Sequence, residues 1–234
     1  MNNTFSTLIS KLTKEEKSIL KNNLASQIES FFDDGNNLKL GDSIIEGKFN
    51  LLAETLRILT PNNERMSSNG IAFRGFPKWV TTELLENLQN EAVDRRNKPL
   101  DRFDHFLGCG GKEADLLSIS KEVEQFVSNY VGKVESTGIA SYLYYDRVGD
   151  GIRPHIDTEV FSINLILMLK HKFDPKLNKK SATVVFPAYQ PAEKYYLDVG
   201  EVLIMFGSSV IHTRTIINAD EEVHLLTIGY KLVN

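Results

Sequence analysis

A histidine, an aspartate and a second histidine stand where together they could hold one metal ion. His155 and Asp157 are separated by a single residue, and side chains alternate along an extended chain, so both should point to the same face. His212 belongs to a later segment rich in β-branched residues, where an imidazole needs a polar role. Two imidazoles and one carboxylate on one face of an octahedron leave the opposite positions open. The pattern therefore predicts an open metal site, because a closed structural zinc site usually takes a fourth ligand such as Cys.

A His-x-Asp pair alone is a weak signal, so its surroundings matter. The pair follows a turn that contains Gly149 and Gly151, and that turn follows a segment rich in tyrosine. The second histidine comes after an apolar segment at residues 200–206. This order favours a shared metal site. The alternative is a hydrogen-bonded core histidine and an aspartate in a surface turn.

The segments that must position these residues differ between the two halves of the chain. Near the beginning, Thr13 and Glu16 form a capping-box pattern, and apolar residues recur at helical spacing through Phe31. A short second helix is expected over 51–59, where a Thr-Pro pair follows. The polar loop 61–70 then predicts a boundary between an N-terminal helical extension and the rest of the chain.

After this boundary the pattern predicts helices first and strands afterwards. Helices are expected over 81–95 and 116–131, with an irregular, glycine-containing stretch over 97–112 between them. From Gly138 onward, short segments rich in Val, Ile, Tyr, Phe and Thr alternate with turn residues, which is typical of β-strands. These segments are 139–145, 160–169, 182–186, 201–206, 209–217 and 223–231. The order predicts an α+β protein whose sheets form a sandwich or a barrel.

The bulk composition excludes several classes of protein. The 234 residues carry a formal net charge of −4, which gives no global attraction to nucleic acid or to an anionic membrane. The longest apolar run, 165–169, is too short to span a bilayer, and the N-terminus lacks a secretory signal pattern. The single cysteine, Cys109, cannot form an internal disulfide, so a reducing, cytoplasmic location is expected. The oligomeric state is not indicated by these patterns.

Residues 138–231 resemble the iron(II)- and 2-oxoglutarate-dependent dioxygenases. Three stretches carry the likeness: 145–157, which ends in His-x-Asp, the apolar segment 161–169, and 200–212, which ends in the second histidine. Members of this family build the same triad inside a double-stranded β-helix. The resemblance therefore implies a jelly-roll or cupin-like double-stranded β-helix core with N-terminal and flanking helices.

The resemblance also implies an organisation and an activity. The chain is expected to form one domain, with a helical extension over 1–69 and an oxygenase core over 70–234. His155, Asp157 and His212 would bind iron(II), with 2-oxoglutarate as co-substrate, dioxygen as oxidant and ascorbate as a stimulant. The expected reaction hydroxylates an unactivated carbon of a small-molecule or amino-acid-like substrate and releases succinate and carbon dioxide. Two alternatives stay open: an iron(II) oxidase that does not use 2-oxoglutarate, and a non-catalytic β-barrel binding module.

The sequence departs from the family pattern in one respect. Members place a basic residue a short distance after the second histidine to pair with the distal carboxylate of 2-oxoglutarate, whereas this window holds two glutamates and His224. His224 could serve as a donor. Arg214 is the stronger candidate, because it shares strand parity with His212 and a guanidinium pairs well with a carboxylate. Arg214 could instead hold the carboxylate of the substrate, or a structural acid such as Glu201.

Three further residues are expected near the metal. Tyr145 precedes the first ligand at a position that resembles the one lining the keto-acid pocket in the prolyl-hydroxylase branch. Asn164 lies in an apolar segment, where a buried amide contacts the keto acid or makes structural hydrogen bonds. Arg153 shares strand parity with His155 and Asp157, so it faces either the substrate mouth or solvent.

Three other motifs carry weaker signals. Residues 108–113 have some likeness to a phosphate loop but lack its spacing, so a flexible loop that could act as a lid is expected. His105 and Cys109 could be drawn as a thiol–imidazole pair, but nothing in the sequence orients them. The basic run 176–180 is expected to be a solvated loop.

Overall fold

Two antiparallel sheets form the centre of the protein in the computed structural model, which describes residues 3–39, 41, 43–60, 65–98, 100–101, 106–176 and 180–233. The larger sheet has, in spatial order, β1 (Ile71–Gly75), β9 (Val202–Met205), β6 (Ile163–Lys172), β11 (Glu222–Leu232), β4 (Val134–Tyr145), β3 (Phe106–Cys109) and β2 (Leu100–Asp101). The smaller sheet has β5 (Ile152–His155), β10 (Ile211–Arg214), β7 (Thr183–Phe186) and β8 (Glu193–Tyr195). This mixed α and β architecture agrees with the predicted α+β class.

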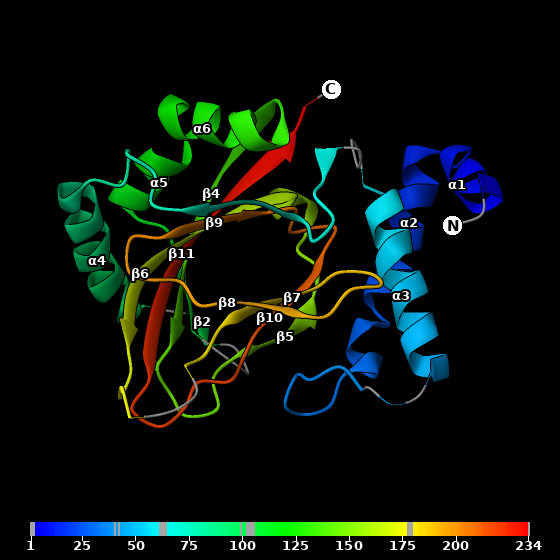
Figure 1. Cartoon of the computed structure of the whole chain (residues 1–234). Helices are drawn as coiled ribbons and strands as arrows, with labels where there is room; N and C mark the ends of the chain where they lie inside the picture. The colour runs from blue at the N-terminus through cyan, green and yellow to red at the C-terminus, as the bar shows by residue number, and fades with distance from the viewer. Residues whose placement is uncertain are drawn as a thin grey trace.

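Helices cover the sheets on two sides (Figure 1). On the larger sheet lie α4 (Thr82–Arg96), α5 (Lys112–Ser118) and α6 (Lys121–Val131). Beside the smaller sheet lie α1 (Asn3–Ser10), α2 (Lys14–Ala25), the 3-10 helix η1 (Ile28–Phe31) and α3 (Ser43–Ile58). A further 3-10 helix, η3 (Glu159–Phe161), precedes β6. Among the described residues, no helix is both long enough and apolar enough to cross a membrane.

The central strands of the larger sheet, β6 and β11, are buried on both faces. Because one face meets the smaller sheet and the other meets the helices, apolar residues face both sides of these strands, as in the unbroken apolar run 165–169 of β6. On β4 the two faces are distinguishable. Tyr142 donates to the Glu91 carboxylate at 2.7 Å and Tyr144 donates to the Ala92 carbonyl at 2.7 Å, so both rings face α4. The alternate residues of β4 therefore face the space between the sheets.

An aromatic cluster joins the N-terminal helices to the smaller sheet. The ring of Phe32 lies 5.8 Å from that of Phe49 in α3 and 4.8 Å from that of Phe186 in β7, both edge to face. Asn36 donates from Nδ2 to the Ile152 carbonyl of β5 at 3.3 Å. These contacts fix the N-terminal layer next to the strand that ends in His155.

Several elements differ from the sequence prediction. The capping box at Thr13 is confirmed, but α2 ends at Ala25 and a 3-10 turn follows it. The stretch 97–112, predicted to be irregular, contains β2 and β3, and β1 and β8 were also missed. These short strands form through pairing with distant neighbours, which local periodicity does not encode.

Some predictions stay untested by the fold. The double-stranded β-helix topology and the division between residues 1–69 and 70–234 remain predictions. Residues 61–64 of the predicted boundary loop, His105, and 177–179 of the basic run lie outside the described residues.

The aromatic cluster gives a first test of the N-terminal layer. Phe49→Ala is expected to lower the free energy of unfolding by about 3–5 kcal/mol, because it leaves a cavity against Phe32 and Phe186. The matched control is Leu51→Ala on the same helix, where the side chain is 51% exposed and the expected change is within about 0.5 kcal/mol. Urea unfolding of both variants measures the difference. Equal losses would contradict a packing role for the layer.

Candidate metal centre and its cavity

Two histidines face each other across neighbouring strands of the smaller sheet. β5 and β10 run antiparallel, and His155 and His212 are direct partners in this register. Their ring centroids lie 4.4 Å apart. β5 is an edge strand, which tolerates Pro154 because the missing N–H removes no hydrogen bond from a central ladder. The cross-strand pairing thus brings together two imidazoles that are far apart in the sequence.

Both imidazoles present the same nitrogen to the space between them. His155 Nδ1 lies 2.7 Å from the Arg153 carbonyl, and His212 Nδ1 lies 2.9 Å from the Val210 carbonyl. A carbonyl only accepts hydrogen bonds, so each Nδ1 carries a proton, and Nε2 is the nitrogen that can give its lone pair to a metal once it is deprotonated. A backbone acceptor behind a histidine is the arrangement that orients imidazoles as metal ligands.

The Asp157 carboxylate completes the group. Its Oδ1 lies 3.5 Å from His155 Nε2 and its Oδ2 lies 3.6 Å from His212 Nε2. One ligand atom from each of the three residues lies within 4.8 Å of the other two. Two imidazole nitrogens and a carboxylate oxygen at this spacing form a donor set that suits iron, zinc and related transition metals.

The position of Asp157 depends on a loop as well as on strand alternation. β5 ends at His155, and the Asp157 N–H donates to the Gly207 carbonyl at 2.9 Å. Asn164 Nδ2 donates to Asp157 Oδ2 at 2.8 Å. A Cβ atom at Gly207 would lie 2.2 Å from the same Oδ2, so only glycine leaves room for this carboxylate. The loop after β9 is therefore shaped around Asp157.

The side chains of Asp157 and His212 stabilise each other's charged states. Burial raises the pKa of Asp157, but the charge of His212 and hydrogen bonds from both histidines outweigh it and hold this pKa well below its usual range. Burial lowers the pKa of His212, and the Asp157 carboxylate more than compensates, so the net shift is upward. The site thus holds an ionised carboxylate inside the protein, where a cation would be its natural partner.

A cavity of about 540 Å³ opens beside this group and lies between the two sheets. Its volume lies within the usual range for small-molecule sites. The predicted residues Tyr145, Arg153, Asn164 and Arg214 all line it. The other lining residues are mainly apolar or carry hydroxyl groups: Leu107, Ser141, Leu143, Ile152, Ile156, Thr158, Phe161, Ile166, Thr183, Thr213, Leu225 and Thr227, together with Glu29 from η1.

Arg214 is the buried cation of this cavity. Its side chain is 2% exposed, and its guanidinium lies 5.7 Å from the centre of the Tyr145 ring. Nη2 donates to Ser181 Oγ at 2.7 Å, whereas Nε and Nη1 have no hydrogen-bond partner. The alternative structural acid, Glu201, pairs with Arg74 at 2.6 Å. Arg214 therefore lines the cavity and carries two buried donors that have no partner.

The other predicted polar residues take different positions. Arg153 is exposed, and its carbonyl orients His155. Asn164 has its Nδ2 on Asp157, while its buried Oδ1 has no partner. The structure does not bring His224 into the cavity. It lies on the opposite face of β11, with its ring 5.0 Å from Tyr144 and its Nε2 3.1 Å from Glu222. Strand alternation separates it from Leu225, which does line the cavity.

The predicted loop at 108–113 is instead a strand end and a helix start. The Glu91 carboxylate accepts the backbone N–H groups of Glu113 and Ala114 at 2.8 and 3.0 Å. An acidic group already occupies the place where a phosphate would bind, which excludes the phosphate-loop interpretation. Cys109 is a free, exposed thiol.

Sequence reasoning missed three residues near the centre. Gly207 follows an apolar strand, and an isolated glycine there is a known signal of close backbone approach. Ser181 contacts Arg214 directly, and Glu221 is linked to Arg214 through Ser181, but neither residue stands in a recognisable motif. Their role depends on a loop-to-loop contact that only the fold reveals.

No protein-family model and no curated protein matches the sequence, but solved structures match the fold. SnoN, an α-ketoglutarate-dependent epimerase from nogalamycin biosynthesis solved with Fe³⁺, α-ketoglutarate and nogalamycin RO, matches with a TM-score of 0.58 and 11% identity over 77% of this chain and 84% of that chain. A Burkholderia pseudomallei oxidoreductase of the 2OG-Fe(II) oxygenase family matches at 0.56, with 12% identity over 69% and 84%. HygX from Streptomyces hygroscopicus, solved with nickel, 2-oxoglutarate and hygromycin B, matches at 0.54, with 10% identity over 70% and 83%.

The close fit of Gly207 against Asp157 gives a test of this geometry. Gly207→Ala is expected to lower the affinity for Mn²⁺ by about 10-fold or more, because the new methyl group displaces the carboxylate. Gly47→Ala on α3 is the control, since its Cβ meets no atom within 4 Å. Calorimetric titration measures both. Unchanged affinity in the Gly207 variant would contradict a built metal centre.

The chain thus shares its fold with structures of the 2OG-Fe(II) oxygenase family and carries a His-x-Asp…His group at the cavity between its sheets.

Proposed function

We propose that the protein is an iron(II)- and 2-oxoglutarate-dependent oxygenase, with His155, Asp157 and His212 as the metal ligands. The observation that carries the proposal is the convergence of two Nε2 atoms and a carboxylate, with each Nδ1 already engaged by a carbonyl. Bound iron supplies dioxygen activation coupled to the oxidation of 2-oxoglutarate to succinate and carbon dioxide. The neighbours solved with iron or nickel and the keto acid support this choice of metal and co-substrate. We also propose that the two sheets together form a double-stranded β-helix.

Arg214 is the residue that binds the distal carboxylate of 2-oxoglutarate in this proposal. It lies two residues along β10 from His212, a separation of about 7 Å along a strand, which suits a five-carbon diacid held at the metal by its other end. A buried guanidinium with two unused donors needs an anionic partner. Tyr145 lines the same pocket beside it, and Asn164 holds Asp157 from the other side.

The substrate in this proposal is a small molecule or an amino-acid-like compound that enters past Arg153. The largely apolar lining suits a carbon skeleton, and the exposed Arg153 at the lining suits an acidic group on it. SnoN and HygX are solved with small-molecule ligands, which agrees with this class. Hydroxylation of an unactivated carbon is the outcome we favour, and the cytoplasm is the expected location.

The metal ligands can be tested one by one. His155→Ala, Asp157→Ala and His212→Ala are each expected to lower Fe²⁺ affinity by more than about 100-fold, beyond the usual effect of losing a partner behind a ligand. His224→Ala is the matched control, because this histidine faces α4 and leaves the cavity unchanged. Anaerobic Fe²⁺ titration gives the affinities. A wild-type affinity in any triad variant would remove that residue from the metal site.

The co-substrate is tested by turnover. With Fe²⁺, ascorbate and 2-oxoglutarate, the wild-type protein is expected to release succinate, and Arg214→Met is expected to raise the KM for 2-oxoglutarate by about 10- to 100-fold through loss of charge-assisted hydrogen bonds. Arg95→Met on α4 is the control. Oxygen uptake without any consumption of 2-oxoglutarate would instead favour the iron oxidase, with Arg214 binding the substrate's carboxylate.

A further inference from the structure

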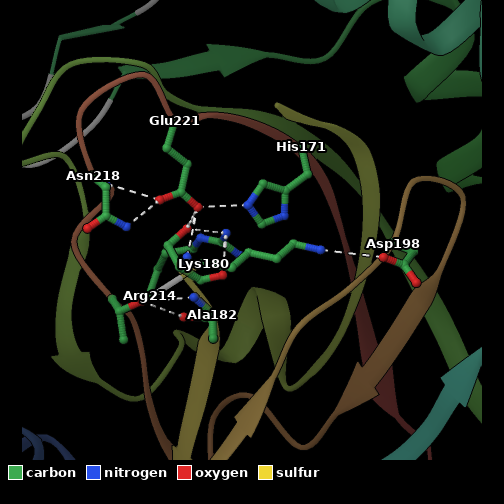
Figure 2. Close-up of polar contacts among 9 residues, drawn as sticks. His171, Lys180, Ala182, Asp198, Arg214, Asn218 and Glu221 are labelled. Atoms are coloured by element: carbon green, nitrogen blue, oxygen red, sulfur yellow. Dashed lines mark hydrogen bonds and ion pairs between the residues drawn. The ribbon is translucent and has the colours of Figure 1, made fainter. Parts of the chain in front are cut away.

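A series of buried hydrogen bonds links Arg214 to Glu221, whose further partners are drawn in Figure 2. Nη2 of Arg214 donates to Ser181 Oγ at 2.7 Å, and the Ser181 hydroxyl donates onward to Glu221 Oε1 at 2.6 Å. Both side chains beyond Arg214 are buried. A hydroxyl has one proton, so accepting from arginine and donating to glutamate uses it in one defined direction.

The Glu221 carboxylate is held more firmly than an ordinary buried acid. Its Oε1 also accepts from His171 Nε2 at 2.7 Å and from the Ser181 N–H at 2.8 Å, and its Oε2 accepts from Asn218 N and Nδ2, both at 3.0 Å. Burial raises the pKa of Glu221, but the hydrogen bonds from His171, Ser181 and Asn218 bring it well below the usual range. The acid is therefore an ionised, immobile anchor.

The segment that carries Ser181 is equally fixed. Arg214 pairs with Thr183 across β10 and β7. Next to this pair, Thr215 N–H donates to the Ala182 carbonyl at 2.9 Å, and Ala182 N–H donates to Thr215 Oγ1 at 2.8 Å. The serine hydroxyl has little freedom to move away from the guanidinium, so the direction of the Arg214 side chain is set from behind.

The Ser181 hydroxyl separates the charges of Arg214 and Glu221, and this separation has a physical consequence. If Glu221 touched Arg214 directly, the two charges would neutralise each other and the carboxylate would occupy donors of the guanidinium. One intervening hydroxyl keeps the negative charge close enough to compensate burial, while Nε and Nη1 stay without partners. The arrangement balances the charge at a distance and leaves the guanidinium available for an incoming anion.

We propose that Ser181 and Glu221 are positioning residues that aim the Arg214 guanidinium at the distal carboxylate of the keto acid, and that they set the preference for dicarboxylic over monocarboxylic keto acids. The inference rests on the proposed function. In this proposal Arg214 on β10 replaces the basic residue that is missing after the second histidine. Glu221, which supports Arg214 through Ser181, comes from the segment in which other members of the family carry that basic residue.

The experiment compares two keto acids on the same variants. Binding to Mn²⁺-loaded protein is measured by calorimetry for 2-oxoglutarate and for 2-oxopentanoate, which has the same carbon chain without the distal carboxylate. Ser181→Ala is expected to weaken 2-oxoglutarate binding by about 3- to 10-fold, the usual effect of one hydrogen bond, and to leave 2-oxopentanoate unchanged. Ser181→Thr keeps the hydroxyl and is expected to retain the preference. Ser118→Ala is the control, because Ser118 is a buried serine of α5 whose hydroxyl donates to the Asp115 carbonyl.

The possible outcomes distinguish the positioning role of Ser181 and Glu221 from the proposed use of 2-oxoglutarate. Equal losses for both keto acids in Ser181→Ala, or no loss for either, would overturn the positioning role while wild-type binding of 2-oxoglutarate stands. Loss of the preference in a folded Ser181→Thr variant would also overturn it. Wild-type protein that binds metal but not 2-oxoglutarate would overturn the proposed co-substrate, and the inference with it.

Discussion

The antiparallel pairing of β5 with β10 is the constraint on which the site depends. It sets His155 directly across from His212, and the carbonyls behind the two rings select the nitrogens that face inward. The third candidate ligand and the loop next to it are arranged around this pair of histidines. Asp157 reaches it from just beyond the strand end, and Gly207 leaves the room for its carboxylate. A slip of one residue between these strands would turn one imidazole to the opposite face.

The cavity holds two charged groups of opposite sign, Asp157 and Arg214. The carboxylate of Asp157 lies beside His212, and Arg214 lies two residues further along β10. The two histidines hold the pKa of Asp157 low, whereas burial lowers the pKa of Arg214 and the charge of Glu221 partly opposes this shift. A ligand with a metal-binding head and a negative tail complements both groups at once. The remaining lining is apolar or carries neutral hydroxyl groups, apart from Glu29 and Arg153, so few other charges compete for such a ligand.

The sequence was informative where a pattern was local. Strand parity and the glycine-containing turn were enough to select His155 and Asp157, and the run of β-branched residues marked the strand of His212. It was misleading where contacts join distant segments. The two glutamates after the second histidine stand where the family places a basic residue, yet one of them, Glu221, is linked to Arg214 through Ser181 and does not line the cavity. The short strands β1, β3 and β8 also depend on partners that no window of sequence contains.

The contact of Asn36 with β5 bears on the solubility of the folded chain. β5 is the edge of its sheet, and an edge strand offers free backbone groups to strands of other molecules. The Asn36 amide engages the carbonyl of Ile152, and Pro154 contributes no N–H, so little of this edge is left as a template for pairing. The N-terminal layer thus covers part of the edge strand that carries His155, which limits intermolecular sheet formation at the sheet edge nearest the candidate metal centre.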